Sequence, residues 1–346
     1  MKLQVLALDG VFDTGLSTIL DVFTTANELN VMLSLGMPPF EVSVAGTRER
    51  VQTSQGFAVP LSGIFDPRGS DWLIIPGIGY KMPELLVPAL DRSDIRDAKL
   101  AIRAAKGAGM NIAAACIGTF VLAESGMLDG EKATTTWWLA PLFRQRYPKV
   151  RLEDGNMLVR SGSLVTAGAA LGHMDMALWL VRQVSPELAS LVARYLIVDS
   201  RPAQSAYVLT DHLAHADPMV ERFERWARSR LSEGFSLDEA AEAVAVSKRT
   251  LARRLQQVLG KTPLSFFQDL RVERAVHLLK TSDKSPDEIA ALVGYADGAT
   301  LRALLRQKLG RGVREVRTGN GSDLPPLEQI IQTADTEPAI GIGIEH

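Results

Sequence analysis

The stretch that decides the fold of the C-terminal region runs from Ser236 to Gly260: S236-LDEAAEAVAVSKRTLARRLQQVL-G260. Its apolar spacing predicts a helix, a short turn and a second helix, and glycine is the usual residue to end a helix in the left-handed conformation. Ser236 and Glu239 have the spacing of a capping box at the first helix, and Ser247 is expected to cap the second. The stretch therefore predicts a helix-turn-helix unit.

The second helix of this stretch has two faces of different character. The apolar face, which is expected to lie against a core, holds Leu251, Leu255 and Val258. The opposite face holds Lys248, Arg249, Ala252, Arg253 and Gln256. A DNA major groove accepts such a helix, in which arginine reads guanine while lysine and threonine hold phosphate. A charged face that is only solvated is the alternative.

The same pattern returns fifty residues later in the chain. Eight of 25 positions are identical between residues 236–260 and 286–310, Thr250 and Thr300 among them. The region 217–317 holds 19 Lys/Arg and 14 Asp/Glu, although the whole chain has a formal net charge of −2. A basic region indicates a polyanion partner. Two units at fixed spacing are expected to enter successive major-groove segments, roughly 34 Å apart.

Several ordered motifs accompany the repeat. They are Asp217-Pro218-Met219-Val220, Gly260 with Thr262, Pro263 and Phe266, the run LRVERAVHLL from Leu270 to Leu279, Ile289-Ala290, and Val293-Gly294-Tyr295. On these residues the region 217–317 resembles the DNA-binding domain of the AraC/XylS family. Together with the charged helix face, the resemblance implies DNA contacts from Lys248, Arg249, Thr250, Arg253, Thr300, Arg302 and Arg306.

The second unit departs from the family pattern. Residues 310–317 lack the usual proline and aromatic residue, and Ala303 stands where arginine is common. The resemblance therefore implies that the first unit does most of the base reading and that the second grips the DNA backbone.

The first 190 residues alternate short apolar strands with helices. Strands are predicted at 3–8, 41–46, 72–75 and 111–115, and helices at 16–34 and 95–108. This alternation predicts an α/β domain in which helices cover both faces of a parallel sheet. Ligands of such folds bind beyond the carboxyl ends of the strands, where this chain has glycine-containing turns.

The single cysteine, Cys116, lies between a predicted strand and a predicted helix. A residue at such an elbow is expected to be exposed, and a helix N-terminus lowers a thiol pKa, so one interpretation is a nucleophile. A small buried cysteine is the alternative. The Cys116 elbow, the stretch FVLAESGMLDGEKATTTWW (120–138) and the segment 166–175 resemble the ThiJ/PfpI group, which has a flavodoxin-like, class I glutamine amidotransferase-like fold.

Enzymes of this fold pair the cysteine with a histidine and an acid. At the matching positions this chain has Thr136 and Gly15, with Asp13 nearby. The resemblance therefore implies no catalytic residue and no enzyme, because a thiol without a base is a poor nucleophile. His173 lies outside the motif and is expected to be a core or surface residue. A Cys-dependent hydrolase or hydratase joined to a DNA-binding module is the alternative.

An effector pocket is predicted around the Cys116 elbow. Gly77 and Gly79 are expected to leave room for a ligand there. Trp137 and Trp138 are expected to line the pocket as stacked indoles, which attract quaternary ammonium groups. Packing is the alternative role of both tryptophans. The candidate ligand-binding residues are Cys116, Ile117, Gly77, Gly79, Thr136 and Trp137.

The composition excludes several classes of protein. Hydrophobic residues make up 46% and charged residues 23%, which is typical of a globular protein. The N-terminus reads as a strand and not as a signal peptide, and no apolar run suffices for a membrane helix. One cysteine excludes an internal disulfide and favours a cytoplasmic protein. No metal-ligand spacing or nucleotide-binding glycine motif occurs, so no metal and no cofactor are predicted.

These patterns predict a sensor domain at 1–190, a linker at 191–216, a DNA-binding domain at 217–317 and a disordered tail at 318–346. Regulators with this domain order form a group called GlxA-like, and the resemblance implies a metabolite-controlled, sequence-specific transcription regulator. The implied partners are promoter DNA, RNA polymerase, a second copy in a homodimer and an effector such as an amino acid or a quaternary ammonium compound. The helix around 173–184 is either a dimer contact or a core helix.

Overall fold

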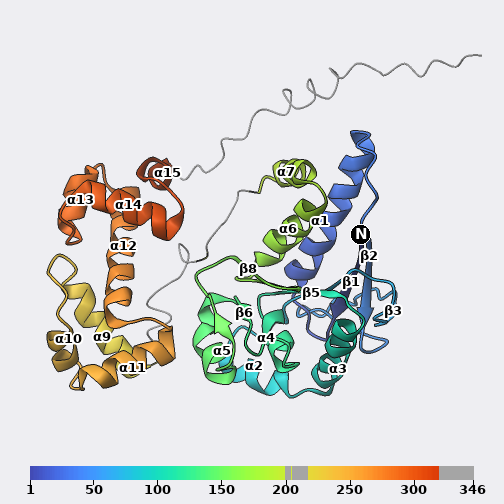
Figure 1. Cartoon of the computed structure of the whole chain (residues 1–346), viewed down its shortest axis with the longest axis horizontal. Helices are drawn as coiled ribbons and strands as arrows, with labels where there is room; N and C mark the ends of the chain where they lie inside the picture. Colours follow the sequence, from blue (N-terminus) through green and yellow to red (C-terminus); the bar gives the residue numbers. More distant parts are fainter. Residues whose placement is uncertain (199–203, 205–216, 319–346) are drawn as a thin grey trace, which may run out of the picture.

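The computed structural model describes residues 1–198, 204 and 217–318, which form an α/β domain followed by an all-helical domain (Figure 1). The predicted tail beyond residue 318 and nearly all of the stretch 199–216 lie outside the described residues. Within the described ranges, no helix is both long and apolar enough to cross a membrane.

A seven-stranded sheet forms the centre of the first domain. Its strands are β1 (Lys2–Ala7), β2 (Glu41–Gly46), β3 (Gly63–Ile64), β4 (Trp72–Ile75), β5 (Asn111–Ala115), β8 (Leu158–Ser161) and β9 (Leu164–Ala167). They lie in the order β3-β2-β1-β4-β5-β9-β8, and only the β8–β9 pair is antiparallel. Two short strands, β6 (Lys132–Ala133) and β7 (Arg151–Leu152), pair separately. The predicted parallel sheet is confirmed.

Helices cover both faces of this sheet (Figure 1). One face packs against α1 (Asp13–Met32), α6 (Gly172–Val184) and α7 (Pro186–Tyr195). The other packs against α2 (Pro83–Leu90), α3 (Ser93–Gly107), α4 (Gly118–Glu124) and α5 (Ala140–Arg146), which follows the 3-10 turn η1 (Trp137–Leu139). In β1, Leu3 and Val5 enter the first core and Leu6 the second, since successive side chains of a strand point to opposite faces.

The helix predicted around 173–184 is α6, and it is a core helix. Met176 and Leu180 are fully buried in the core that α6 shares with α1 and α7. The same core takes Leu188 and Val192 of α7, so the α/β domain continues past residue 190.

The second domain consists of helices only. They are α9 (Pro218–Ser229), α10 (Leu237–Ala243), α11 (Lys248–Leu259), α12 (Pro263–Thr281), α13 (Pro286–Leu292), α14 (Gly298–Leu309) and α15 (Val313–Thr318). The pairs α10–α11 and α13–α14 are the two predicted helix-turn-helix units, each with its own hydrophobic core. The long helix α12 runs between them and contributes to both cores (Figure 1).

Candidate nucleic-acid interface and effector pocket

Helix α11 begins and ends as its sequence predicts. The Ser247 hydroxyl accepts a hydrogen bond from the Thr250 N–H (3.1 Å), and Gly260 ends the helix with φ +66°. Leu251 and Leu255 are fully buried, which fixes the orientation of the helix. The capping box predicted one helix earlier is half formed: Ser236 caps α10, but the Glu239 carboxylate pairs with Arg230 (2.8 Å) instead.

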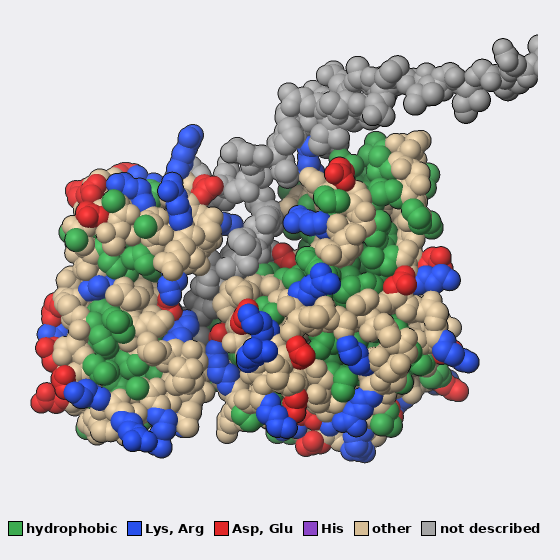
Figure 2. All heavy atoms as spheres, viewed as in Figure 1, with side chains coloured by type: hydrophobic (Ala, Val, Ile, Leu, Met, Phe, Trp, Pro, Cys, Tyr) green, Lys and Arg blue, Asp and Glu red, His purple; other side chains and the backbone are tan. Residues whose placement is uncertain are grey.

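The charged face of α11 lies on the surface. Arg249 and Arg253 are exposed and make no ion pair within the part of the chain that the structure describes. Lys248 is also exposed and pairs with Asp238 (2.8 Å). Figure 2 shows Lys and Arg side chains along the edge of the helical domain where α11 lies. This face therefore offers guanidinium groups without a competing carboxylate.

The next residue, Arg254, has a structural role. Its Nε donates to Asp217 Oδ2 (2.6 Å), and the Asp217 carboxylate also caps α9 by accepting from the N–H groups of Met219 and Val220. Burial alone raises the pKa of Asp217, but these hydrogen bonds outweigh burial and hold the pKa below its ordinary value. Arg254 thus ties α11 to α9.

The second unit repeats the arrangement of the first. The Asp297 carboxylate accepts from the Thr300 N–H (2.7 Å), while Leu301 and Leu305 are buried. Arg302 and Arg306 are exposed one turn apart, and neither makes an ion pair among the described residues.

A buried arginine that the sequence did not reveal joins the two units. Arg271 of α12 donates through Nε to the Leu231 carbonyl (2.9 Å) and through Nη2 to the Glu233 carbonyl. Its guanidinium lies over the ring of Tyr295, 5.3 Å from the centroid. A Cβ atom at Gly294 would approach Arg271 Nη2 to 2.3 Å, so this glycine makes room for the arginine. Arg271 therefore links the α9–α10 turn to the second unit.

The Cys116 elbow between β5 and α4 is confirmed, and of the two interpretations of its side chain the structure supports the small buried cysteine and not the exposed nucleophile. Cys116 has φ +56° and is 4% exposed. Burial raises the pKa of the thiol to about 12, against smaller lowering contributions from Ile117, Thr136 and Lys81. At neutral pH the side chain is therefore a buried thiol.

His173, which lies beside this elbow, is fully engaged. Its Nε2 accepts a hydrogen bond from the Gly77 N–H (2.9 Å), so Nδ1 carries the proton and donates to the Ala170 carbonyl (2.7 Å). Burial lowers the pKa of His173 to about 4. A Cβ atom at Gly15 would lie 2.7 Å from the imidazole. The imidazole thus fills the space next to Gly15, and neither of its nitrogens is free to accept a proton from the Cys116 thiol.

The candidate pocket residues are only partly brought together. A Cβ atom at Gly77 would touch the Cβ of Cys116 (3.4 Å) and the Ile117 nitrogen (3.5 Å), so these three residues are neighbours. A Cβ atom at Gly79 would lie 2.3 Å from the Cβ of Ser54, so this glycine makes room for the Ser54 side chain. Thr136 is fully buried next to the Cys116 thiol, whose pKa it lowers against the larger effect of burial, although the geometry between the two side chains is not that of a regular hydrogen bond.

Trp137 and Trp138 do not form a stacked pair, and the alternative role in packing holds for Trp137. The rings of Trp137 and Trp138 meet edge to face, with an interplanar angle of 85° and centroids 5.6 Å apart. Trp137 packs against the core of the first helix-turn-helix unit. Trp137 is the first residue of η1, directly after Thr136, and from there its side chain contacts the helical domain.

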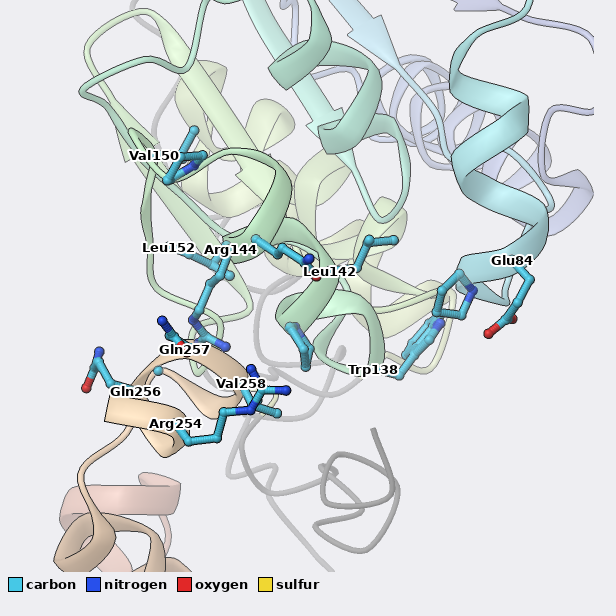
Figure 3. Close-up of a pocket in the computed structure, with 15 residues that line it drawn as sticks. Glu84, Trp138, Leu142, Arg144, Val150, Leu152, Arg254, Gln256, Gln257 and Val258 are labelled. Carbon is cyan, nitrogen blue, oxygen red and sulfur yellow. The ribbon is translucent and has the colours of Figure 1, made fainter. Parts of the chain in front are cut away.

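A cavity of about 930 Å³ lies between the two domains (Figure 3). Trp138, Leu142 and Arg144 line it from the α/β domain, and Gln257 and Val258 line it from α11. None of the six candidate pocket residues takes part in this lining. The effector site at Cys116 therefore stays a prediction, separate from this cavity.

Comparisons with known proteins agree with the two-domain architecture. Residues 1–183 match the DJ-1/PfpI family, and residues 240–319 match a helix-turn-helix domain family. HTH-type transcriptional regulator ArgR of Pseudomonas aeruginosa is 28% identical over 222 residues, which cover 63% of this chain and 67% of ArgR. HTH-type transcriptional regulator GbdR of the same species is 26% identical over 234 residues, which cover 66% of this chain and 64% of GbdR.

A solved structure is similar to part of the chain as well. The AraC family transcriptional regulator from Pseudomonas putida superposes with a TM-score of 0.47 at 18% identity, over 56% of this chain and 98% of that one. The family matches of the two domains are the stronger finding, because the first of them spans more than half of the chain. The chain belongs to the DJ-1/PfpI family and carries an AraC-type helix-turn-helix module after that domain.

Proposed function

We propose that the chain is a sequence-specific DNA-binding transcription regulator whose N-terminal domain senses a small metabolite. The observation that carries this proposal is the exposed pair Arg249 and Arg253 on α11, with Leu251 and Leu255 buried behind them. A recognition helix needs this combination of free donors and a rigid backing. The names of ArgR and GbdR support the same function.

We infer that the N-terminal domain acts as a sensor and not as a catalyst. The Cys116 thiol is buried and has a raised pKa, and both nitrogens of His173 are occupied by hydrogen bonds. Nucleophilic catalysis needs a base that accepts the thiol proton, and Thr136 stands where the fold's enzymes have that base. The proposal includes an amino acid or quaternary ammonium effector near Cys116, a homodimer in the cytoplasm, and RNA polymerase as a partner at the promoter.

Selection of bound fragments from random duplex DNA by the full chain tests the regulator proposal. The recovered sequences are expected to share two short motifs about one helical turn apart. Arg249→Ala should abolish enrichment of the motif read by α11. Arg225→Ala is the matched control, because this exposed arginine of α9 pairs with Glu221 (2.9 Å) and lies outside both recognition helices. No enrichment by the parent protein would refute the proposal.

Thermal shift with L-arginine and with glycine betaine tests the sensor. A ligand at 100 times its Kd stabilises the protein by about 2.7 kcal/mol, which a melting curve resolves. The competing enzyme hypothesis predicts substrate turnover that is lost in Cys116→Ser. Such turnover would overturn the sensor assignment, whatever the DNA selection shows.

A further inference from the structure

We propose that residues 134–146 couple the Cys116 loop to the recognition helix α11 of the same chain. This coupling segment comprises residues 134–136, which follow β6, together with η1 and α5. The proposal rests on the proposed function and adds to it the route between the sensor pocket and the DNA-reading helix.

The first end of the coupling segment is bonded to the Cys116 loop. Thr135 Oγ1 donates to the Cys116 carbonyl (2.9 Å), and the Thr134 N–H donates to Thr166 Oγ1 (2.8 Å). Thr134, Thr135 and Thr166 are all buried, so water cannot replace these bonds. A ligand that shifts the Cys116 loop must therefore move Thr135 with it or break a buried hydrogen bond.

The other end of the segment is seated on the first helix-turn-helix unit. Trp137 packs against the core of that unit. Arg144, held by an ion pair with Asp154 (2.6 Å), lies against the end of α11 at Gly260. A Cβ atom at Gly260 would approach Arg144 Nε to 2.4 Å, so only glycine allows this contact without displacing the guanidinium. Figure 3 shows Arg144 pointing toward the end of α11 that carries Gln257 and Val258.

The one described residue between the domains meets the same segment. Gln204 is fully buried, and its Nε2 donates to the Thr135 carbonyl (2.8 Å) and to Thr134 Oγ1 (3.1 Å). A Cβ atom at Gly168 would lie 2.2 Å from Gln204 Nε2, so the backbone leaves a fitted space for this amide. The covalent connection and the docking of α11 thus converge on residues 134–146.

The docking leaves the reading face of α11 open. Arg249 and Arg253 remain exposed, and the cavity of about 930 Å³ separates part of the two surfaces. Interfaces between domains of one chain commonly allow relative motion. The contact therefore sets the orientation of α11 relative to the sensor and does not mask its arginines.

Distance measurement between spin labels in the full chain tests the docking. Ala104→Cys on α3 and Ala243→Cys on α10 place labels on exposed sites of the two domains, while buried Cys116 stays unlabelled. We expect one narrow distance distribution, which Gly260→Ala broadens. Gly310→Ala is the matched control, because Gly310 ends α14 with the same φ of +66°. A broad distribution in the parent protein, or equal broadening by both variants, overturns the docking.

A second pair of variants tests the link to the Cys116 loop and avoids the strain of a changed helix end. Thr135→Val removes the hydroxyl that bonds the Cys116 carbonyl, whereas Thr119→Val removes a buried hydroxyl that has no partner among the described residues. We expect Thr135→Val to shift or broaden the distance distribution and Thr119→Val to leave it unchanged. Equal responses overturn the coupling. A narrow distribution in a protein that selects no DNA would refute only the proposed function.

Discussion

Replacement of Arg253 by alanine tests which face of α11 meets DNA, because the neighbouring Arg254 is a matched control. Arg253 is exposed and unpaired within the described ranges, whereas Arg254 is bonded to the Asp217 carboxylate. Loss of a bidentate arginine–guanine contact costs about 1–3 kcal/mol of binding free energy. At 1.4 kcal/mol per tenfold, Arg253→Ala is expected to bind its operator roughly 5- to 150-fold more weakly, with an unchanged free energy of unfolding.

Arg254→Ala should show the opposite pattern. Asp217 keeps its two backbone N–H donors but loses its ion-pair partner, so we expect the free energy of unfolding to fall by about 1 kcal/mol. Fluorescence anisotropy with selected and scrambled duplexes at fixed salt measures the binding, and urea denaturation measures the stability. If Arg253→Ala weakens both duplexes equally, or if Arg254→Ala is the variant that loses sequence preference, the assigned DNA-facing surface is wrong.

The remaining predictions concern buried groups. Arg271→Met should lower the free energy of unfolding by about 1–3 kcal/mol, because it leaves the buried Leu231 carbonyl without its hydrogen-bond donor. An unchanged midpoint of urea denaturation would contradict the role of Arg271 in linking the α9–α10 turn to the second unit. The pKa of Cys116 is raised to about 12, so iodoacetamide at pH 8 should alkylate this thiol far more slowly in the folded protein than in urea. Mass spectrometry follows the alkylation, and equal rates in the two states would argue against burial. His173 has a pKa of about 4 in the fold and an ordinary value of 6.5, so the unfolded chain takes up a proton in this interval that the folded protein does not. Stability should therefore fall as pH decreases from about 6.5 to about 4, and a His173→Asn variant with the same slope would exclude this histidine as the cause.

The helix-turn-helix units could be predicted because their signals are local. A capping serine such as Ser247, a leucine face and a terminal glycine all lie within one 25-residue stretch, and the structure forms each of them. Arg271 escaped prediction because its main acceptor, the Leu231 carbonyl, lies 40 residues away and carries no side-chain signal. In the sequence, only Gly294, which makes room for the Arg271 side chain, points to this buried arginine.

The surroundings of Cys116 were harder to predict than its backbone. The strand–helix junction indicated an elbow, but the exposure of the thiol depends on what packs around it, and the neighbours of Cys116 include Thr135 and Gly77, which are distant in the sequence. The burial of His173 agrees with one of its two expected roles, but its place beside the elbow was not predicted, because its Gly77 partner is 96 residues away in the chain. The sequence feature that fits this arrangement is the pair of glycines near the histidine, Gly172 next to it in the chain and Gly15 against its ring in the fold.

The tie between the two helix-turn-helix units, made by Arg271 as described above and also by Asp269 of α12, affects how an operator is chosen. The Asp269 carboxylate forms ion pairs with Lys261, in the turn after α11 (2.7 Å), and with Lys308 of α14 (2.9 Å), so it links the end of the first recognition helix to the second one. When the protein resists adjustment, the duplex must supply the bend or twist that brings both grooves into register. Base pairs that no side chain touches then affect affinity through their stiffness, and flexible pyrimidine–purine steps between the half-sites are favoured.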